Sequence, residues 1–131
     1  MTITRCSARL LLIILLMLIA VRASADWVKS SENDIAVFYI DHSTISRENG
    51  NLRRAWELQD LKARGPNGEQ SRRVLTEYHC QEERWRMIAV ACHSGQMATG
   101  KTLVDGRISG AWEDAPHDTP AEYALKLICS R

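Results

Sequence analysis

The 131-residue sequence lacks a strong excess of charge of either sign. It has 17 Lys and Arg residues against 16 Asp and Glu residues, and its formal net charge is +1. It also lacks internal repeats and low-complexity tracts. Because a nucleic-acid-binding domain typically carries a basic surplus, this composition argues against that class and predicts one ordinary globular domain.

The sequence lacks an apolar run long enough for an ordinary membrane-spanning helix. Such a helix needs about 20 apolar residues. The longest run, Leu10–Ile19, reaches roughly half of that length before Arg22 interrupts the segment. The run therefore fits the apolar region of a signal peptide better than a transmembrane span, although an uncleaved anchor is the alternative.

The residues around this run complete a signal-peptide pattern. Arg5 and Arg9 precede it, and Ala23-Ser24-Ala25 supplies the small-x-small pattern that a signal peptidase recognises. We therefore expect residues 1–25 to be cleaved before Asp26. Location in the periplasm, at the cell surface or outside the cell follows from that expectation.

No cysteine follows the apolar run at a position where a lipid could be attached, because Cys6 precedes the run. Lipid anchoring is therefore not predicted. The mature domain, residues 26–131, keeps 14 basic and 16 acidic residues, which gives a net charge of −2. Neither a nucleic acid partner nor a transmembrane span is expected for it.

A recognisable catalytic arrangement is absent as well. No serine lies in a nucleophile-elbow motif, and no Ser/His/Asp or Cys/His order is evident. His42 and His117 are expected to be solvated loop residues, and Glu82-Glu83 and Glu113-Asp114 to be solvated carboxylates in turns. We predict no catalytic residues and no cofactor. The alternative is a periplasmic enzyme or redox protein that uses a reactive thiol at Cys92-His93, which would require a lowered thiol pKa.

One motif matches a nucleotide-binding pattern letter for letter. Residues 95–102 read GQMATGKT, the G-x-x-x-x-G-K-[ST] of a phosphate-binding loop, with Gly95, Gly100, Lys101 and Thr102 at its fixed positions. That loop must open a helix whose N-terminus faces the phosphates. The residues that follow, 103–110, contain two glycines and no helical stripe. We therefore interpret the match as accidental and predict a glycine-bounded loop between strands.

Two His-Cys pairs suggest a metal site, but their spacing does not support one. His79-Cys80 and Cys92-His93 are each adjacent in sequence. Neighbours on a strand point to opposite faces, so neither pair can chelate a metal while extended. We predict no metal site.

Most of the mature segment has the alternating pattern of antiparallel strands. Turn or loop signals at 49–51, 65–68 and 81–83 separate them. Ile35–Ile40 is apolar throughout and is predicted to be buried on both faces, whereas the other strands should have one solvated face. The expected strands are Ile35–Ile40, Leu52–Leu61, Val74–Cys80, Arg84–Cys92 and a stretch around Lys101–Asp105.

The C-terminal segment has the pattern of an amphipathic helix. Thr119 is the predicted N-cap, Pro120 the first helical residue, and Glu122 the partner that completes a capping box. One face carries the apolar stripe of Ala121, Ala124, Leu125, Ile128 and Cys129. The fold class is therefore α+β, an antiparallel sheet packed by a C-terminal helix.

Three cysteines remain in the mature domain: Cys80, Cys92 and Cys129. In an oxidising compartment two of them should form a disulfide. If 74–80 and 84–92 form a hairpin, Cys80 and Cys92 lie at opposite ends, roughly 25 Å apart, which excludes their pairing. Cys129 therefore pairs with one of the other two, and the residues alone leave the choice open.

The order and spacing of several residues carry a resemblance to a known family. They are Trp27, Tyr39-Ile40-Asp41, Ser43-Thr44-Ile45, Trp56, Ser71, Tyr78-x-Cys80, Arg84, Arg86, Met97-x-x-Gly100, Trp112, Pro116 and Cys129. In these residues the mature chain resembles the surface-adhesin protein E family, small exported proteins of Gram-negative bacteria.

The resemblance implies a curved sheet of about five to six strands covered by the C-terminal helix. It also implies that Cys80 pairs with Cys129, which leaves Cys92 as a free thiol. The chain departs from the family pattern at His79, where an acidic residue is usual. It also lacks the lipid-accepting cysteine of the best-known member, which favours a soluble periplasmic protein.

The function predicted from these observations is that of an exported, non-enzymatic, adhesin-like binding module whose ligand is unknown. Its partner would be a protein or another component of the cell envelope. A second copy of the chain, which would form a homodimer, is one such protein. We identify Trp85 and Tyr78 as a candidate binding patch, and their exposure to solvent on a sheet face would support that role.

Overall fold

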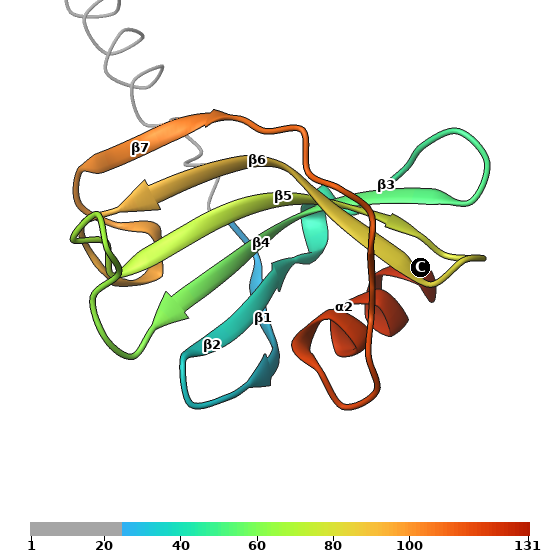
Figure 1. Cartoon of the computed structure of the whole chain (residues 1–131), viewed down its shortest axis with the longest axis horizontal. Helices are drawn as coiled ribbons and strands as arrows, with labels where there is room; N and C mark the ends of the chain where they lie inside the picture. The colour runs from blue at the N-terminus through green and yellow to red at the C-terminus, as the bar shows by residue number, and fades with distance from the viewer. Residues whose placement is uncertain (1–24) are drawn as a thin grey trace, which may run out of the picture.

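Eight antiparallel strands form one curled sheet, a half-barrel, in the computed structural model, which describes residues 25–131 (Figure 1). The spatial order of the long strands is β1-β2-β4-β5-β6-β7, with β3 paired to β4 and β8 paired to β6. The strands are β1 (Trp27–Glu32), β2 (Ala36–Asp41), β3 (Ser46–Arg47), β4 (Leu52–Leu61), β5 (Ser71–His79), β6 (Arg84–His93), β7 (Thr102–Arg107) and β8 (Glu113–Asp114).

One helix, α2 (Pro120–Cys129), lies inside the curl, and the α+β prediction is confirmed. We call the sheet face that α2 covers the inner face and the opposite one the outer face. Ile40, Ala55 and Tyr78 of the inner face pack against a buried stripe of the helix. That stripe comprises Ala124, Leu125 and Ile128. This hydrophobic cluster therefore lies between the sheet and the helix.

Strands β5 and β6 form a long hairpin within the sheet, and its predicted pairing is confirmed. His79 pairs with Arg84 beside the turn, and Ser71 pairs with His93 at the far end. The strand starts at Ser71, three residues before the predicted start, and Cys80 lies in the turn. A bulge between the Leu75 and Thr76 pairs interrupts the register, and such a bulge increases the local twist that curls a sheet.

The prediction that residues 35–40 are buried on both faces is wrong. Ile35 precedes β2 and is 69% exposed. Val37, Phe38 and Tyr39 are only half-buried. β2 lies next to the edge strand β1, and α2 covers only part of the inner face, so this strand does not have the two packed layers that its composition suggested.

Helix α2 begins as predicted, but its capping box is incomplete. The Thr119 hydroxyl accepts a hydrogen bond from the Glu122 N–H at 3.4 Å, and Pro120 follows as the first helical residue. The Thr119 N–H donates to the Pro116 carbonyl instead of to Glu122. The Glu122 carboxylate contacts Lys126 and His117. The predicted N-cap is therefore confirmed, but the reciprocal hydrogen bond of a capping box, from the Thr119 N–H to the Glu122 carboxylate, is absent, and that part of the prediction is wrong.

Candidate ligand site

A cavity of about 400 Å³ lies between the inner face of the sheet and the first turn of α2. This volume is within the range of small-molecule sites, about 300–1,000 Å³. Its apolar walls come from the sheet and from the segment that leads into the helix: Phe38, Val74, Trp85, Met87, Pro116 and Ala121. The cavity therefore has the shape and the lining of a ligand site.

Glu57 supplies the carboxyl group among these walls. It follows the buried Ala55 by two positions on β4, so it shares the inner face. The Tyr78 hydroxyl lies 2.9 Å from each of its carboxylate oxygens. Burial raises the pKa of Glu57 to about 7, although hydrogen bonds with Thr76 and Tyr78 oppose the shift. A carboxyl group inside the cavity therefore changes its charge near neutral pH.

The pKa of Tyr78 moves in the same direction. Burial raises it well above its ordinary value, and the charge of Glu57 and the hydrogen bond between the two groups add to the shift. Tyr78 is therefore a neutral hydrogen-bond donor to Glu57 at physiological pH.

The rim of the cavity depends on a close approach of the chain to β6. The Gly110 N–H donates to the Met87 carbonyl at 3.1 Å, and a Cβ at position 110 would lie 2.4 Å from that oxygen. Glycine is therefore required there. Just beyond it, β8 pairs with the start of β6, and the Trp85 indole donates to the Asp114 carbonyl at 3.2 Å. Glu113 and Asp114, expected in a solvated turn, thus form the acidic rim.

Tyr78 and Trp85 do not form an exposed aromatic patch, the arrangement that would have supported a binding surface. Tyr78 is 2% exposed because α2 packs over it. The two residues are nevertheless direct cross-strand partners, and both line the cavity. The structure brings the two predicted residues together, but in a cavity wall instead of on a surface.

The Cys92-His93 thiol does not have the properties that catalysis would need. Cys92 is a free cysteine, 5% exposed, and burial followed by the charge of Glu69 raises its pKa. His93 accepts a hydrogen bond from Arg73 at 3.1 Å. Burial and the charge of Arg73 lower the pKa of His93. A reactive thiol needs a lowered pKa, and the shift at Cys92 runs the other way.

The loop that matches the nucleotide motif folds onto the outer face and leads into a strand. Its short 3₁₀ turn, η2 (Gln96–Ala98), precedes β7, so no helix follows it. The Met97 N–H donates to Asp60 at 2.8 Å, and the Ala98 N–H donates to Ser71 at 2.9 Å. These two N–H groups of the loop are thus engaged within the protein, and the loop connects two strands.

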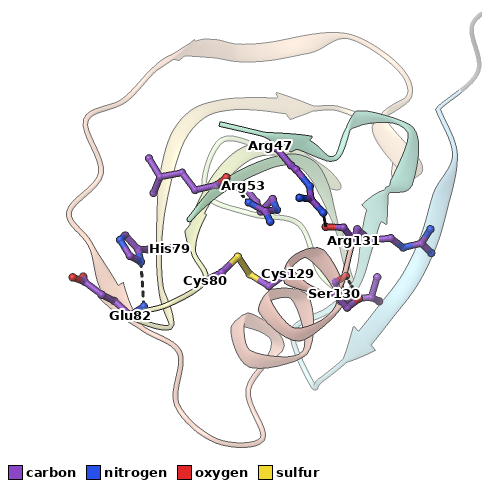
Figure 2. Close-up of a disulfide and its surroundings, with 10 residues drawn as sticks. Arg47, Arg53, His79, Cys80, Glu82, Cys129, Ser130 and Arg131 are labelled. Atoms are coloured by element: carbon purple, nitrogen blue, oxygen red, sulfur yellow. Dashed lines mark hydrogen bonds between the residues drawn. A yellow bond between two sulfur atoms is a disulfide. The ribbon is translucent and has the colours of Figure 1, made fainter. Parts of the chain in front are cut away.

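A disulfide joins Cys80 to Cys129, with 5.7 Å between the two Cα atoms. It connects the turn between β5 and β6 to the last residue of α2, and Figure 2 shows it enclosed by the curl of the sheet. Beside it, the ring of His79 accepts a hydrogen bond from the Glu82 N–H at 3.1 Å (Figure 2). The disulfide therefore fixes the helix over the inner face.

The outer face carries a second enclosed carboxylate, Glu77, which is 1% exposed. Arg54 and Arg86 donate hydrogen bonds to it at 2.7 Å and 2.6 Å, and the Trp112 ring lies 4.5 Å from the Arg86 guanidinium. Burial alone would raise the pKa of Glu77, but the hydrogen bonds and charges of the two arginines outweigh it and lower the pKa. This carboxylate is therefore a stably charged structural group.

Our sequence-based reasoning did not identify Glu57 or Glu77. Each lies at a polar position of a strand, where a solvated side chain is the default interpretation. Glu57 lies opposite Ile40 and Val74 of its neighbouring strands, and Glu77 lies opposite Arg54 and Arg86. Both placements depend on a register that the sequence does not give.

Other features of the described residues add no second site. In residues 25–131, no cluster of three or more His, Cys, Asp and Glu side chains could hold a metal ion. In the same range, no helix has the length and apolar character needed to cross a bilayer.

The fold and the site define a disulfide-linked half-barrel with a ligand-sized cavity between its sheet and its helix. The sequence pattern of the family described as "Surface-adhesin protein E" matches residues 27–130. The chain belongs to the surface-adhesin protein E family.

Solved structures share the fold of this chain. Crystal form II of Haemophilus influenzae protein E superposes with a TM-score of 0.64 at 15% sequence identity, over 82% of this chain and 90% of that one. Protein E from non-typeable Haemophilus influenzae gives a TM-score of 0.62 at 14% identity, over 84% and 79% of the two chains. No curated protein sequence matches the chain significantly. At these identities the structural likeness shows a shared fold.

Proposed function

We propose that this chain is an exported, non-enzymatic binding module of the periplasm or the cell surface, and that the inner cavity is its ligand site. The observation that carries the proposal is the cavity itself, with apolar walls and a buried carboxyl group. Such a combination of apolar walls and a few polar groups is typical of ligand sites.

The compartment is supported by two independent features. The N-terminal sequence has the pattern of a cleaved signal peptide. The Cys80–Cys129 disulfide is typical of proteins in oxidising compartments. Membership of a family of surface adhesins supports a role in binding, and the buried thiol of Cys92 does not favour the enzymatic alternative.

Native mass spectrometry of the protein recovered from each fraction of an expressing bacterium tests this proposal. We would compare the wild type with Ala121→Trp, which fills the cavity mouth, and with Tyr123→Trp, which adds the same ring at an exposed position of the same helix. We expect a chain that begins at Asp26, and a bound ligand on the wild type and on Tyr123→Trp alone.

Three results would contradict the proposal. An uncleaved chain found in the cytoplasm would exclude export. A ligand retained by Ala121→Trp would place the binding site outside the cavity, and a wild type free of ligand in every envelope fraction would count against a binding role.

A further inference from the structure

The charged side chains that line the inner cavity are all carboxylates. Glu57 lies between the walls, Glu113 and Asp114 lie at the rim, and no Lys, Arg or His is among the described residues that line it. Asp114 is 80% exposed and pairs with Arg84 at 3.2 Å, so its charge is largely balanced. Glu57 and Glu113 therefore set the charge that a ligand would meet.

The N-terminus of α2 lies at the cavity mouth and favours an anion, in contrast to the carboxylates. A helix N-terminus carries roughly half a positive charge, and its influence falls off within the first turn. The Thr119 hydroxyl already accepts a hydrogen bond from one of the free N–H groups there. The charge of Glu113, together with the charge that Glu57 gains as it loses its proton near pH 7, outweighs this partial charge, so the cavity favours a cation.

Glu57 has hydrogen-bonding capacity left for a ligand. The Tyr78 hydroxyl lies 2.9 Å from both carboxylate oxygens but has one proton to donate. A carboxylate has about four acceptor positions. Even with Thr76 as a second hydroxyl partner, acceptor positions remain for a donor that enters the cavity.

The walls determine what else such a donor must carry. Phe38, Trp85, Val74 and Met87 present aromatic and aliphatic surface on the inner face. Aromatic faces attract a cation that lies within about 6 Å, and the aliphatic side chains favour an apolar group. A ligand that matches both features has a positively charged head and an apolar body.

We propose that the inner cavity binds a small organic cation, an amine with an apolar body, whose ammonium group donates hydrogen bonds to Glu57 while its body packs against Trp85 and Phe38. This inference rests on the proposed function, since it takes the cavity to be the ligand site. It names the chemical class of the ligand.

The protonation of Glu57 predicts that the affinity for the ligand depends on pH. The other titratable residues that line the cavity are Tyr39 on β2, Tyr78 on β5, and Glu113 and Asp114 on β8; the lining residues of α2 and β6 do not titrate. Because the pKa of Glu57 is about 7 in the free protein, ammonium binding should displace its proton. Affinity should therefore rise about tenfold from pH 6 to pH 8.

Isothermal titration calorimetry on the processed protein recovered from the periplasm tests the inference. The probes are octylamine, 1-octanol and octanoate, which share an apolar body and differ in the head group. We expect octylamine to bind at least about tenfold more tightly than 1-octanol, with proton release detected as a buffer-dependent heat, and octanoate to show no binding.

The Glu57→Gln variant distinguishes the contribution of the charged head group to binding from that of the apolar cavity. It should weaken octylamine binding by about tenfold or more and abolish the proton release, while 1-octanol binding stays unchanged and so reports an intact cavity. The matched control is Glu82→Gln, an exposed glutamate in the turn between β5 and β6, which should leave all three probes unaffected.

Equal binding of 1-octanol or octanoate, lost in Ala121→Trp, would overturn the cation inference and leave the cavity as the ligand site. Failure of octylamine to bind the wild type would also overturn the inference. In that case the native mass spectra decide separately on the proposed function, because they detect any ligand that the cell supplies.

Discussion

Each face of the sheet encloses a glutamate, and the pKa of the carboxyl group is raised on one face and lowered on the other. Glu57 on the inner face has hydroxyl partners and no cationic one among the causes of its shift, so burial dominates and its pKa rises to about 7. Glu77 on the outer face is bound by two arginines, which lower its pKa although only 1% of the residue is exposed.

This difference separates a structural carboxylate from a functional candidate. A charge that is paired within the protein has its hydrogen-bonding capacity used. A carboxylate that is desolvated without a cation is costly to keep charged, unless a ligand supplies the missing charge. The inner face therefore holds a carboxyl group without a cationic partner, whereas the carboxylate of the outer face is bound by two arginines.

The largest expected effect comes from removing the disulfide that holds α2 on the inner face. The bridged cysteines are 49 residues apart, and chain-entropy arguments assign such a loop about 4 kcal/mol. We expect Cys129→Ser to lower the free energy of unfolding in urea by about that amount. It should also move the pKa of Glu57 toward its ordinary value and leave that of Glu77 unchanged.

Cys92→Ala is the matched control, because it removes a buried thiol that forms no disulfide. We expect it to cost about 1 kcal/mol. If Cys129→Ser cost no more than this control, the disulfide would have no special role in fixing the helix.

The second effect concerns the outer face. Glu77→Gln leaves two guanidinium groups close together without their shared anion, and breaking a buried ion pair costs about 3–5 kcal/mol. Arg54 and Arg86 are 41% and 35% exposed and can be rehydrated, so we expect a smaller loss in urea unfolding at pH 7, about 2–3 kcal/mol.

The exposed Glu82→Gln should change stability by less than about 0.5 kcal/mol in the same assay. Equal stabilities of the two variants would show that the outer-face network contributes nothing to the fold.

The smallest effect has the opposite sign. The pKa of Glu57 is raised from 4.5 to about 7 in the folded state, so the folded protein binds more protons than the unfolded chain between these values. Its contribution to stability therefore falls as pH rises through that window. We expect Glu57→Gln to remove this fall and to be more stable than the wild type at pH 8 by about 1–2 kcal/mol.

Urea unfolding of both proteins from pH 5 to pH 8 measures this difference. At pH 5 the two proteins should be nearly equal, because Glu57 is then mostly protonated in the folded state. A Glu57→Gln variant that is less stable than the wild type at pH 8 would show that the charged carboxylate is satisfied inside the protein.

The features that the sequence predicted well are those set by local rules. Turn residues at 81–83 placed the hairpin of β5 and β6, and Thr119 and Pro120 placed the start of α2. The pairing of Cys80 with Cys129 came from the family resemblance, since local geometry left two choices. β1 was missed because its sequence, WVKSSE, is largely polar and forms a strand only beside β2.

The candidate site could not be predicted because its parts come together through long-range packing. Glu57 follows Trp56 and precedes Leu58, a context in which a charged residue ordinarily faces water. It is enclosed because a helix more than 60 residues later in the sequence lies over the same face. Tyr78 was identified as a candidate, but its burial depends on the same helix.

The most direct test of this account is an NMR titration of the side-chain carboxyl carbons of Glu57 and Glu77 in the processed protein. The account predicts that Glu57 titrates near pH 7 and that Glu77 titrates below its ordinary value of 4.5. Octylamine should lower the pKa of Glu57 and leave that of Glu77 unchanged. Two carboxyls that titrate together near 4.5, with no response to octylamine, would contradict it.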